Sequence, residues 1–297
     1  MARAEKKQEV ATRGGNGGGV TITDDMLKEL IADAGAGIST AAEDNLIPII
    51  LLLQDMSPEV KKRDPNNYVE GAEAGMYMNR ATKQLWAGDK AMSERTGKPM
   101  LEFQYCYLDK GIVEWVPRTE GGGFIARYPL DGDVESAMRK IGGRKGRDPN
   151  DPNKSVWKAP ESNNDLIETR YHFGHIINND HPQPAVIPFS STGHTTSRQW
   201  TTMAGGFMTE VAHPDTGELV LVKQPVWWRK YIVGSKAREN KKGSFFVGTI
   251  ADGDVIPNAS IRAMGKAMYE AAKAGTVRAG AEDYAGDGGG GEVSDEI

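Results

Sequence analysis

Disulfide bonds, membrane spans and secretion signals have little support in this chain of 297 residues. Cysteine occurs once, at Cys106, so no intramolecular disulfide can form, and we expect this residue to be buried in a strand. The longest apolar run, residues 46–53, is too short to cross a bilayer and contains Pro48. The first ten residues are charged throughout and lack the apolar core of a signal peptide. We therefore expect a soluble, cytoplasmic protein without a membrane partner.

The spaced motifs of common catalytic and metal sites are also absent from the sequence. All five histidines lie between residues 172 and 213, but His172 and His175 are three apart on an expected strand, where odd spacing sends side chains to opposite faces. There is no CxxC, no HExxH and no GK[ST] sequence. Residues 190–200 are rich in hydroxyl groups but lack the GxSxG turn of a serine nucleophile. We expect no cofactor, no metal ion and no catalytic residues, and a metal-dependent nuclease is the least supported function.

Charge and glycine are distributed unevenly along the chain. The net charge is −5, and residues 281–297 contain six acids and no basic residue, so residues 1–280 without them carry a net charge of +1. The 36 glycines gather near the two ends and in a few loops. We expect a disordered N-terminal arm (residues 1–19), a single globular β-rich domain (residues 20–275) and a glycine-rich acidic tail (residues 276–297).

Hydrophobic periodicity predicts a folded centre made mainly of antiparallel strands. Alternation of period two predicts a hairpin over residues 100–116 that turns at Asp109-Lys110-Gly111, and strands over residues 166–178, 185–191, 218–222 and 224–250. Helical spacing predicts helices over residues 23–35, 195–206 and 258–274, and Pro48 leaves residues 40–56 as either helix or strand. The order fits an OB-like Greek-key barrel with long insertions, and equally an α+β sheet with helices on one face.

Basic and aromatic residues are interleaved in residues 223–250, which hold seven basic residues, five aromatic rings and one acid. This mixture is typical of a groove that binds single-stranded nucleic acid, and also of a core hairpin with a solvated outer face. If residues 224–233 form a strand, Trp227, Arg229 and Tyr231 share one face and Trp228 points into the core. The candidate nucleic-acid-binding residues of this stretch are Trp227, Arg229, Lys230, Tyr231, Lys236, Arg238, Lys241 and Lys242.

Two further segments contain basic residues that suit phosphate contacts. The polar connection near residues 131–165 predicts a flexible basic insertion. This insertion either clamps a nucleic-acid strand or only aids solubility. Its candidate nucleic-acid-binding residues are Arg139, Lys140, Arg144, Lys145 and Arg147. Residues 190–200 enter an expected helix, where backbone amides and Arg198 suit a phosphate site. A capped helix with a hydroxyl-rich turn is the plain alternative.

Several strings resemble an uncharacterised family of tailed-bacteriophage proteins: EDNLIPIILLLQDMSPEV, EGAEAGMY, VEWVPR, GGGFIARY, IETRYHFGHI and IPFSSTGHTTSRQW. The resemblance runs from about Glu43 to about Phe246 and implies phage origin and a place in DNA metabolism, with no catalytic residues. Separately, the tail is similar in design to that of bacterial and T7-like phage single-stranded DNA-binding proteins, although it lacks their terminal phenylalanine. This similarity implies partner-binding roles for Glu292, Asp295, Glu296 and Ile297.

These observations together predict a phage single-stranded DNA-binding protein that acts in replication or recombination in the host cytoplasm. Its partners would be single-stranded DNA and, through the tail, phage or host replication proteins; the tail would alternatively compete with DNA for the basic surface. A single-strand annealing recombinase is one alternative, and a virion structural or scaffolding protein is another. The sequence leaves open whether the chain forms a homo-oligomer and whether it prefers DNA or RNA.

Overall fold

The structure is a computed structural model that describes Met26 and residues 46–117, 120, 123–147, 155–178, 181–240 and 243–280. The chain divides into two units, Met1–Thr40 and Ala41–Ile297, and every described residue except Met26 lies in the second unit. The expected N-terminal arm, the rest of the expected helix over residues 23–35 and the acidic residues 281–297 lie outside the described residues. No helix in the described part is long and apolar enough to span a membrane.

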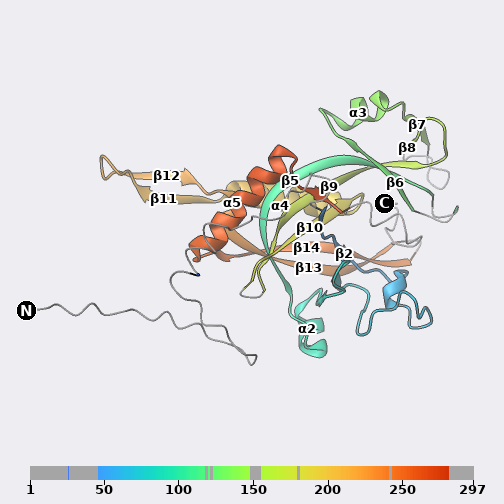
Figure 1. Ribbon diagram of the computed structural model, residues 1–297, viewed down its shortest axis with the longest axis horizontal. Helices are drawn as coiled ribbons and strands as arrows, with labels where there is room; N and C mark the ends of the chain where they lie inside the picture. Colours follow the sequence, from blue (N-terminus) through green and yellow to red (C-terminus); the bar gives the residue numbers. More distant parts are fainter. Residues whose placement is uncertain are drawn as a thin grey trace, which may run out of the picture. The chain divides into compact units, whose positions relative to one another are not determined.

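The largest sheet in the described part has eight strands and is organised around two long antiparallel strands, β5 (Leu101–Trp115) and β9 (Asp165–Ile176) (Figure 1). The other strands of this sheet are β6 (Phe124–Pro129), β7 (Arg144–Arg147), β8 (Ser155–Lys158), β10 (Gln183–Ser190), β13 (Arg229–Asn240) and β14 (Gly243–Val255). The strand order is β14-β13-β5-β9-β8-β7, with β6 added to β5 and β10 added to β9. All of its pairings are antiparallel, which confirms the predicted mainly antiparallel class.

The sheet does not close into the expected Greek-key barrel. Its end strands, β14 and β7, do not pair with each other in the described part. Strand β5 changes partner along its length: Leu101–Gln104 pair with β13, whereas Gly111–Trp115 pair with β6. One long strand therefore supports two separate halves of an open sheet.

Helices cover both faces of this sheet rather than one. On β9, His172 contacts the cluster around Trp200 of α4 (Gly193–Gly206), whereas its neighbour Phe173 belongs to the cluster that contains Met268 of α5 (Ala259–Ala274). Successive residues of a strand point to opposite faces, so α4 and α5 lie on opposite sides of β9. Both helices were predicted from the sequence. The α5 N-cap is Asn258, whose side chain accepts hydrogen bonds from Ser260 and Ile261.

A small sheet and two short parallel strands precede and flank the main sheet. The small sheet contains β2 (Ile50–Leu52), β3 (Tyr77–Asn79) and β4 (Leu85–Trp86), and β1 (Leu46–Ile47) pairs with β15 (Arg278–Ala279), in the first residues of the expected tail. A 3-10 turn, η1 (Pro58–Val60), and a short helix, α2 (Lys90–Thr96), lie among these strands. Residues 46–52 are thus strands interrupted at Pro48 and not a helix.

The predicted turn at Asp109-Lys110-Gly111 is wrong, because β5 runs through it without a break. Gly111 serves a close approach between strands. A Cβ atom added there would lie 2.9 Å from Nε of Arg127 and 3.3 Å from the carbonyl oxygen of Tyr128, both on β6. The absence of a Cβ atom therefore lets β6 pack against β5. The glycine that suggested a turn in the sequence instead allows this close contact between strands.

The described part of residues 131–165 is folded and is not the flexible insertion that we predicted. It contains α3 (Val134–Lys140), capped by the Asp133 side chain, and the β7–β8 hairpin. Their apolar residues pack with Ile112 of β5 and Leu166 of β9. Only residues 148–154, between the two strands of the hairpin, lie outside the described residues. Burial of apolar side chains on the main sheet thus orders a segment whose composition is mostly polar.

Residues 208–255 form two hairpins, and the one formed by β13 and β14 was predicted in the correct place. Strands β13 and β14 pair along their length as expected. A second hairpin, β11 (Met208–Ala212) with β12 (Leu219–Lys223), turns at the predicted His213-to-Gly217 segment. The residues before β13 are different, since Val226–Trp228 form a 3-10 turn, η3, instead of continuing the strand. The alternation that we assumed through both tryptophans is therefore broken.

Candidate anion-binding site

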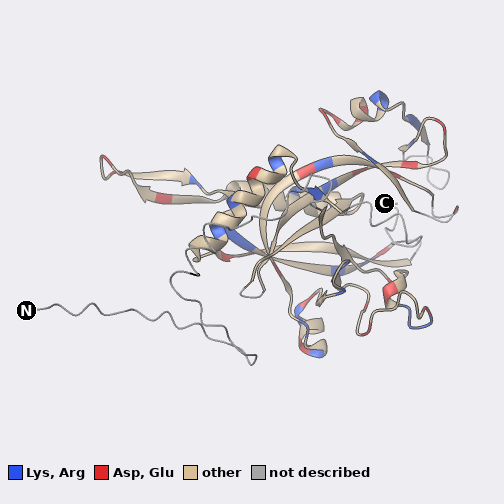
Figure 2. Ribbon diagram, viewed as in Figure 1, with Lys and Arg blue, Asp and Glu red and all other residues tan. Residues whose placement is uncertain are grey.

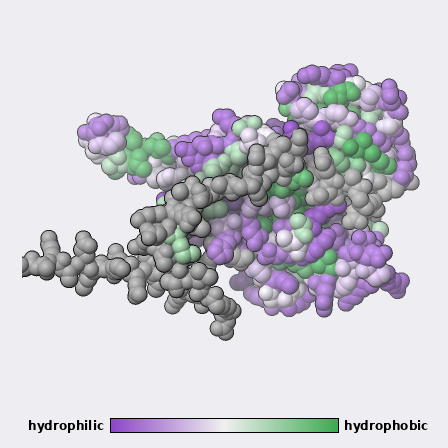
Figure 3. All heavy atoms as spheres, in the orientation of Figure 1, coloured by the Kyte–Doolittle hydropathy of each residue, from purple (hydrophilic) through white to green (hydrophobic). Residues whose placement is uncertain are grey.

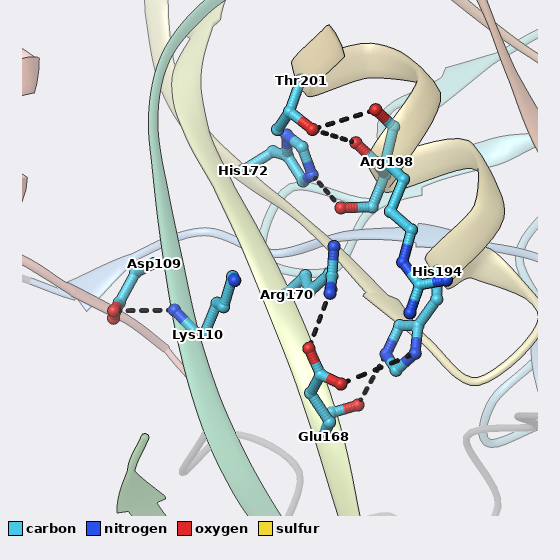
Figure 4. Close-up of polar contacts among 9 residues, drawn as sticks. Asp109, Lys110, Glu168, Arg170, His172, His194, Arg198 and Thr201 are labelled. Atoms are coloured by element: carbon cyan, nitrogen blue, oxygen red, sulfur yellow. Dashed lines mark hydrogen bonds and ion pairs between the residues drawn. The ribbon is translucent and has the colours of Figure 1, made fainter. Parts of the chain in front are cut away.

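Three basic side chains from three elements lie on the α4 side of the main sheet (Figure 4). Lys110 of β5 and Arg170 of β9 are direct partners across the antiparallel ladder, so their side chains share a face. The first turns of α4 pack on the same face and add Arg198. We call Lys110, Arg170 and Arg198 the cationic cluster. It unites one residue that the sequence predicted, Arg198, with two that it did not.

Glu168 is the carboxylate that accompanies the cationic cluster. Nε of Arg170 donates to Oε1 of Glu168 over 2.9 Å, and both side chains are nearly buried, at 10% and 12% exposed. The neighbouring acid Asp109 does not contribute, because it points to the other face and pairs with Arg127. Among the described residues, neither the guanidinium of Arg198 nor the ammonium of Lys110 has an ion pair. The site therefore carries three positive side chains against one negative side chain.

His194, in the first turn of α4, faces Glu168 without adding to the positive charge. Its Nε2 lies 3.0 Å from the backbone carbonyl oxygen of Glu168, and because a carbonyl only accepts, Nε2 carries the proton. Burial lowers the pKa of His194, Arg170 and Arg198 lower it further, and the Glu168 carboxylate opposes them. The imidazole is thus neutral near pH 7, where it fastens α4 to the backbone of β9.

A second histidine holds α4 on the sheet beneath the cationic cluster. Nε2 of the buried His172 lies 2.8 Å from Oγ of Ser197, and its ring stacks on Trp200 with centroids 4.6 Å apart. Burial lowers the pKa of His172 to about 3, so the ring remains neutral. Arg198 follows Ser197 directly, and this contact therefore sets the direction from which Arg198 reaches the cluster.

A cavity of about 120 Å³ opens at the beginning of α4. Thr192 and Gly193 line it, and Thr192 makes no side-chain capping hydrogen bond. Aromatic rings form much of the remaining wall: Tyr77, Trp115, Phe124, Tyr171, Phe189, Phe245 and Phe246. The hydroxyl of the buried Thr169, which lies between Glu168 and Arg170 on β9, also lines it and has no hydrogen-bond partner among the described residues. The cavity thus reaches the first turn of α4, whereas Arg198 lies in the second turn, and Thr169 and Tyr171 point to the face of β9 opposite Arg170.

The aromatic-basic-aromatic stripe that we predicted on residues 227–231 does not exist. Tyr231 is 0% exposed and its ring packs against Tyr105 and Trp200. Trp227 packs against Tyr269 of α5, whereas Trp228, which we placed in the core, is 37% exposed. The η3 turn changes the direction of both tryptophans, and pairing of β13 with β5 then places Tyr231 opposite the buried Phe103.

Two of the four predicted basic residues that the structure describes near the stripe are already paired. Arg229 binds Asp252 through two hydrogen bonds, and Lys230 pairs with Glu102. Lys236 and Arg238 differ, because both are exposed and have no ion pair among the described residues. The remaining candidates of this stretch and of the tail, which are Lys241, Lys242, Glu292, Asp295, Glu296 and Ile297, lie outside the described residues.

The basic residues of the insertion serve mainly to hold its own fold. Arg139 and Lys145 both pair with Glu135, and Arg144 donates to the carbonyl oxygens of Ala159 and Ser162. Lys140 and Arg147 are exposed and have no ion pair in the described part of the chain. The structure therefore separates these residues from the cationic cluster and gives most of them local partners.

Sequence reasoning missed Lys110 and Arg170 for different reasons. Lys110 was assigned to a turn that does not form. Arg170 lies in a predicted strand, where Glu168, Arg170 and His172 alternate onto one face, and three polar residues at alternate positions were an available signal. No group of three or more histidine, cysteine or acidic side chains capable of holding a metal ion occurs among the described residues.

Comparisons with known proteins give one match. No curated protein and no solved structure matches the chain. The family model of the Pam3 phage gp34-like proteins matches residues 19–278, which is most of the sequence and includes every element described above except the last residue of β15. The match confirms the resemblance to a phage protein family, and it does not bear on the similarity of the tail to single-stranded DNA-binding proteins. The chain belongs to the family of Pam3 phage gp34-like proteins.

Proposed function

We propose that the protein binds single-stranded DNA and that the cationic cluster holds the phosphate groups. The observation that carries this proposal is the convergence of Lys110, Arg170 and Arg198 on one face with Glu168 as their one acidic companion. Bringing like charges together costs electrostatic free energy, and an anion bound between them recovers it. Arginine and lysine side chains from a sheet and a helix suit the oxygens of a phosphate backbone.

A polymer fits the distribution of charge better than a small anion does. Figure 2 shows basic residues on the long central strands and on the surrounding helices, and the exposed Lys236 and Arg238 have no acidic partner among the described residues. Contacts at several places along a backbone are what a nucleic acid makes and a small anion does not. The family is a phage family, and the resemblance noted in the sequence implies DNA metabolism.

The cavity beside the cationic cluster favours an unpaired strand over a duplex. Its aromatic walls suit the flat face of a base, and the free hydroxyl of Thr169 offers one polar contact to a base edge. A base is available to such a cavity only when it is not paired with a second strand. Thr192 and Gly193 line the cavity six and five residues before Arg198, so a base in the cavity and a phosphate at the cationic cluster would both contact the N-terminal half of α4.

In the cell this activity would protect unpaired DNA during phage replication or recombination. The acidic tail would contact replication proteins or compete with DNA for the cationic cluster, a role that rests on the sequence alone. The second candidate is a single-strand annealing protein, and the exposed apolar β11–β12 hairpin favours it because annealing requires several protomers along a strand. The same hairpin is compatible with a virion or scaffolding role, which detection of the protein in purified particles would support.

A direct binding measurement tests the proposed function. Fluorescence anisotropy would compare labelled oligo-dT, a duplex of equal length and an RNA of equal length at low and moderate salt. We expect binding of oligo-dT at micromolar protein or below, weaker binding of the duplex, and a loss of affinity with salt of about 0.7 log units per log unit for each phosphate held. Absence of oligo-dT binding at micromolar protein in low salt would remove the proposal. An annealing assay with complementary strands separates the first candidate from the second.

A further inference from the structure

The β11–β12 hairpin stands apart from the rest of the fold. Its two strands pair only with each other among the described strands, and they form a separate sheet. In Figure 1 the hairpin extends beyond α5, away from the main sheet. The outer edge of each strand therefore has backbone groups that no other described strand satisfies.

Both faces of this hairpin expose apolar side chains, and the face that contains Leu221 also holds Glu210 and Lys223. Leu219 is 70% exposed and Leu221 is 61% exposed, and the pairing with β11 places them on the face that contains Met208 and Ala212. Val222 and Val211 are also exposed and lie on the other face. Figure 3 shows the corresponding hydrophobic surface along the hairpin. A two-stranded hairpin that is solvated on both faces is marginally stable in water, so a hairpin of this composition is typical of a surface that a partner covers.

The sequence of β12 is complementary to itself. If two copies of β12 pair antiparallel about Leu221, each Leu221 lies opposite its equivalent, and each Val220 lies opposite Val222 of the other copy. Every central pair then joins two apolar side chains. The same operation on β11 is unfavourable, because it centres on Glu210 and places two carboxylates directly opposite each other. Charge thus selects the β12 edge.

We propose that the protein forms a two-fold symmetric homodimer through the β12 edges of two copies. The two hairpins then form one continuous four-stranded sheet with the order β11-β12-β12-β11. Such an interface is isologous, since the same patch serves both copies, and a second copy of this chain supplies the required surface without another protein. This inference does not depend on DNA binding, although a dimer would place two cationic clusters in one particle.

Introduction of a charge at the two-fold axis tests the dimer. Sedimentation of the full chain would give the dimer mass for the wild type and the monomer mass for Leu221→Lys or Leu221→Glu, because like charges then lie opposite each other. An equimolar mixture of the two variants should recover the dimer, and Val211→Lys, on the other strand, should remain dimeric. Circular dichroism would show that each variant is folded. A monomeric wild type, or a Leu221→Lys variant that dimerises as well as Val211→Lys, would overturn the proposal.

Cross-linking tests the register independently. The native Cys106 is buried and burial raises the pKa of its thiol, so an introduced surface cysteine is the reactive one. In the proposed dimer, Leu221→Cys places two thiols on neighbouring strands, whereas Val211→Cys separates them by three strand spacings, or about 14 Å. A short bismaleimide whose reach is below that separation should give covalent dimers of the first variant only. Equal cross-linking of both variants, or none of either, would contradict the β12 pairing.

Discussion

At the scale of single residues, Trp200 shows how α4 is anchored. It is fully buried and its ring contacts five other rings, those of Phe103, Tyr105, His172, Phe189 and Tyr231. We expect Trp200→Ala to lower the free energy of unfolding by about 3–5 kcal/mol, because it leaves a large cavity at the centre of the core.

Trp228 provides the matched control for that substitution. Its ring is partly exposed and lies against the guanidinium of Arg262, 5.1 Å from the ring centroid. Trp228→Ala should therefore cost no more than about 1 kcal/mol. Urea unfolding of the two variants checks both values. Equal losses of unfolding free energy in the two variants would contradict the difference in burial between Trp200 and Trp228. A larger loss for Trp228→Ala would support the strand through residues 224–233 that the sequence predicted.

The buried histidines predict how stability depends on pH. Burial lowers the pKa of His172 to about 3 and that of His175 to about 4, both from 6.5. The unfolded chain therefore binds protons at these sites below about pH 6.5, whereas the folded chain does not, and stability falls as pH falls. Each histidine contributes roughly 1.4 kcal/mol per pH unit once the unfolded form is protonated.

Urea unfolding between pH 7 and pH 5 measures this slope, since the acidic side chains are still ionised there. The variant His172→Gln should reduce the slope by roughly 1.4 kcal/mol per pH unit, because this group no longer titrates, whereas His175 and His194, whose pKa burial also lowers, still contribute. A free energy of unfolding that does not change over this range would contradict the buried, neutral state of both histidines.

The candidate site could be predicted only in part from single residues. Arg198 was found because a helix beginning and a basic residue are local features of the sequence. Lys110 and Arg170 lie 60 positions apart, and their proximity depends on the β5–β9 register, including an irregularity between Tyr105 and Tyr107. Such a register is set by tertiary packing and is not encoded in either strand alone.

At the scale of elements, the close approach of α5 to the sheet depends on one glycine. A Cβ atom added to Gly265 would lie 2.4 Å from Nε2 of Gln104 and 2.8 Å from Cβ of Trp227. We expect Gly265→Ala to destabilise the protein by about 1–3 kcal/mol, although alanine is the better helix former, because the helix must move away from β5.

Gly206, at the end of α4, is the control for Gly265. A Cβ atom added there meets no other atom within 4 Å. Gly206→Ala should be neutral or slightly stabilising, since it reduces the conformational freedom of the unfolded chain. Thermal unfolding of both variants measures the difference. A Gly265→Ala variant as stable as Gly206→Ala would mean that α5 does not pack this closely.

Elements with a clear period were predicted well, and elements specified by contacts were not. β9, β10, α4 and α5 follow their hydrophobic periodicity closely. The prediction of a flexible insertion was wrong because its few apolar residues order the segment only when they pack against Ile112 and Leu166. The η3 turn was not predicted because a single 3-10 turn leaves no periodic pattern in the sequence. It nevertheless changes the direction in which both tryptophan side chains point.

At the scale of the whole molecule, the distribution of charge predicts an effect of the acidic tail on DNA binding. Residues 281–297 hold six acids and no bases, and residues 1–280 carry a net charge of +1. If the tail competes with DNA for the cationic cluster, a chain that ends at Gly280 should bind oligo-dT more tightly, most clearly at low salt. Titration of both chains at two salt concentrations measures this. Equal affinity would assign the tail to partners other than the cationic cluster.

The central claim is that the cationic cluster holds the phosphate groups, and one comparison of variants tests it most directly. Lys110→Met with Arg198→Met removes two charges from the cluster, and Lys266→Met with Lys273→Met removes two from α5, on the opposite face of the sheet. The affinity for oligo-dT would be measured by anisotropy across a salt series. We predict that the first variant loses at least tenfold in affinity at low salt and about two phosphate contacts from the salt slope, whereas the second stays near the wild type. Equal losses in both variants, or an unchanged slope in the first, would contradict the claim.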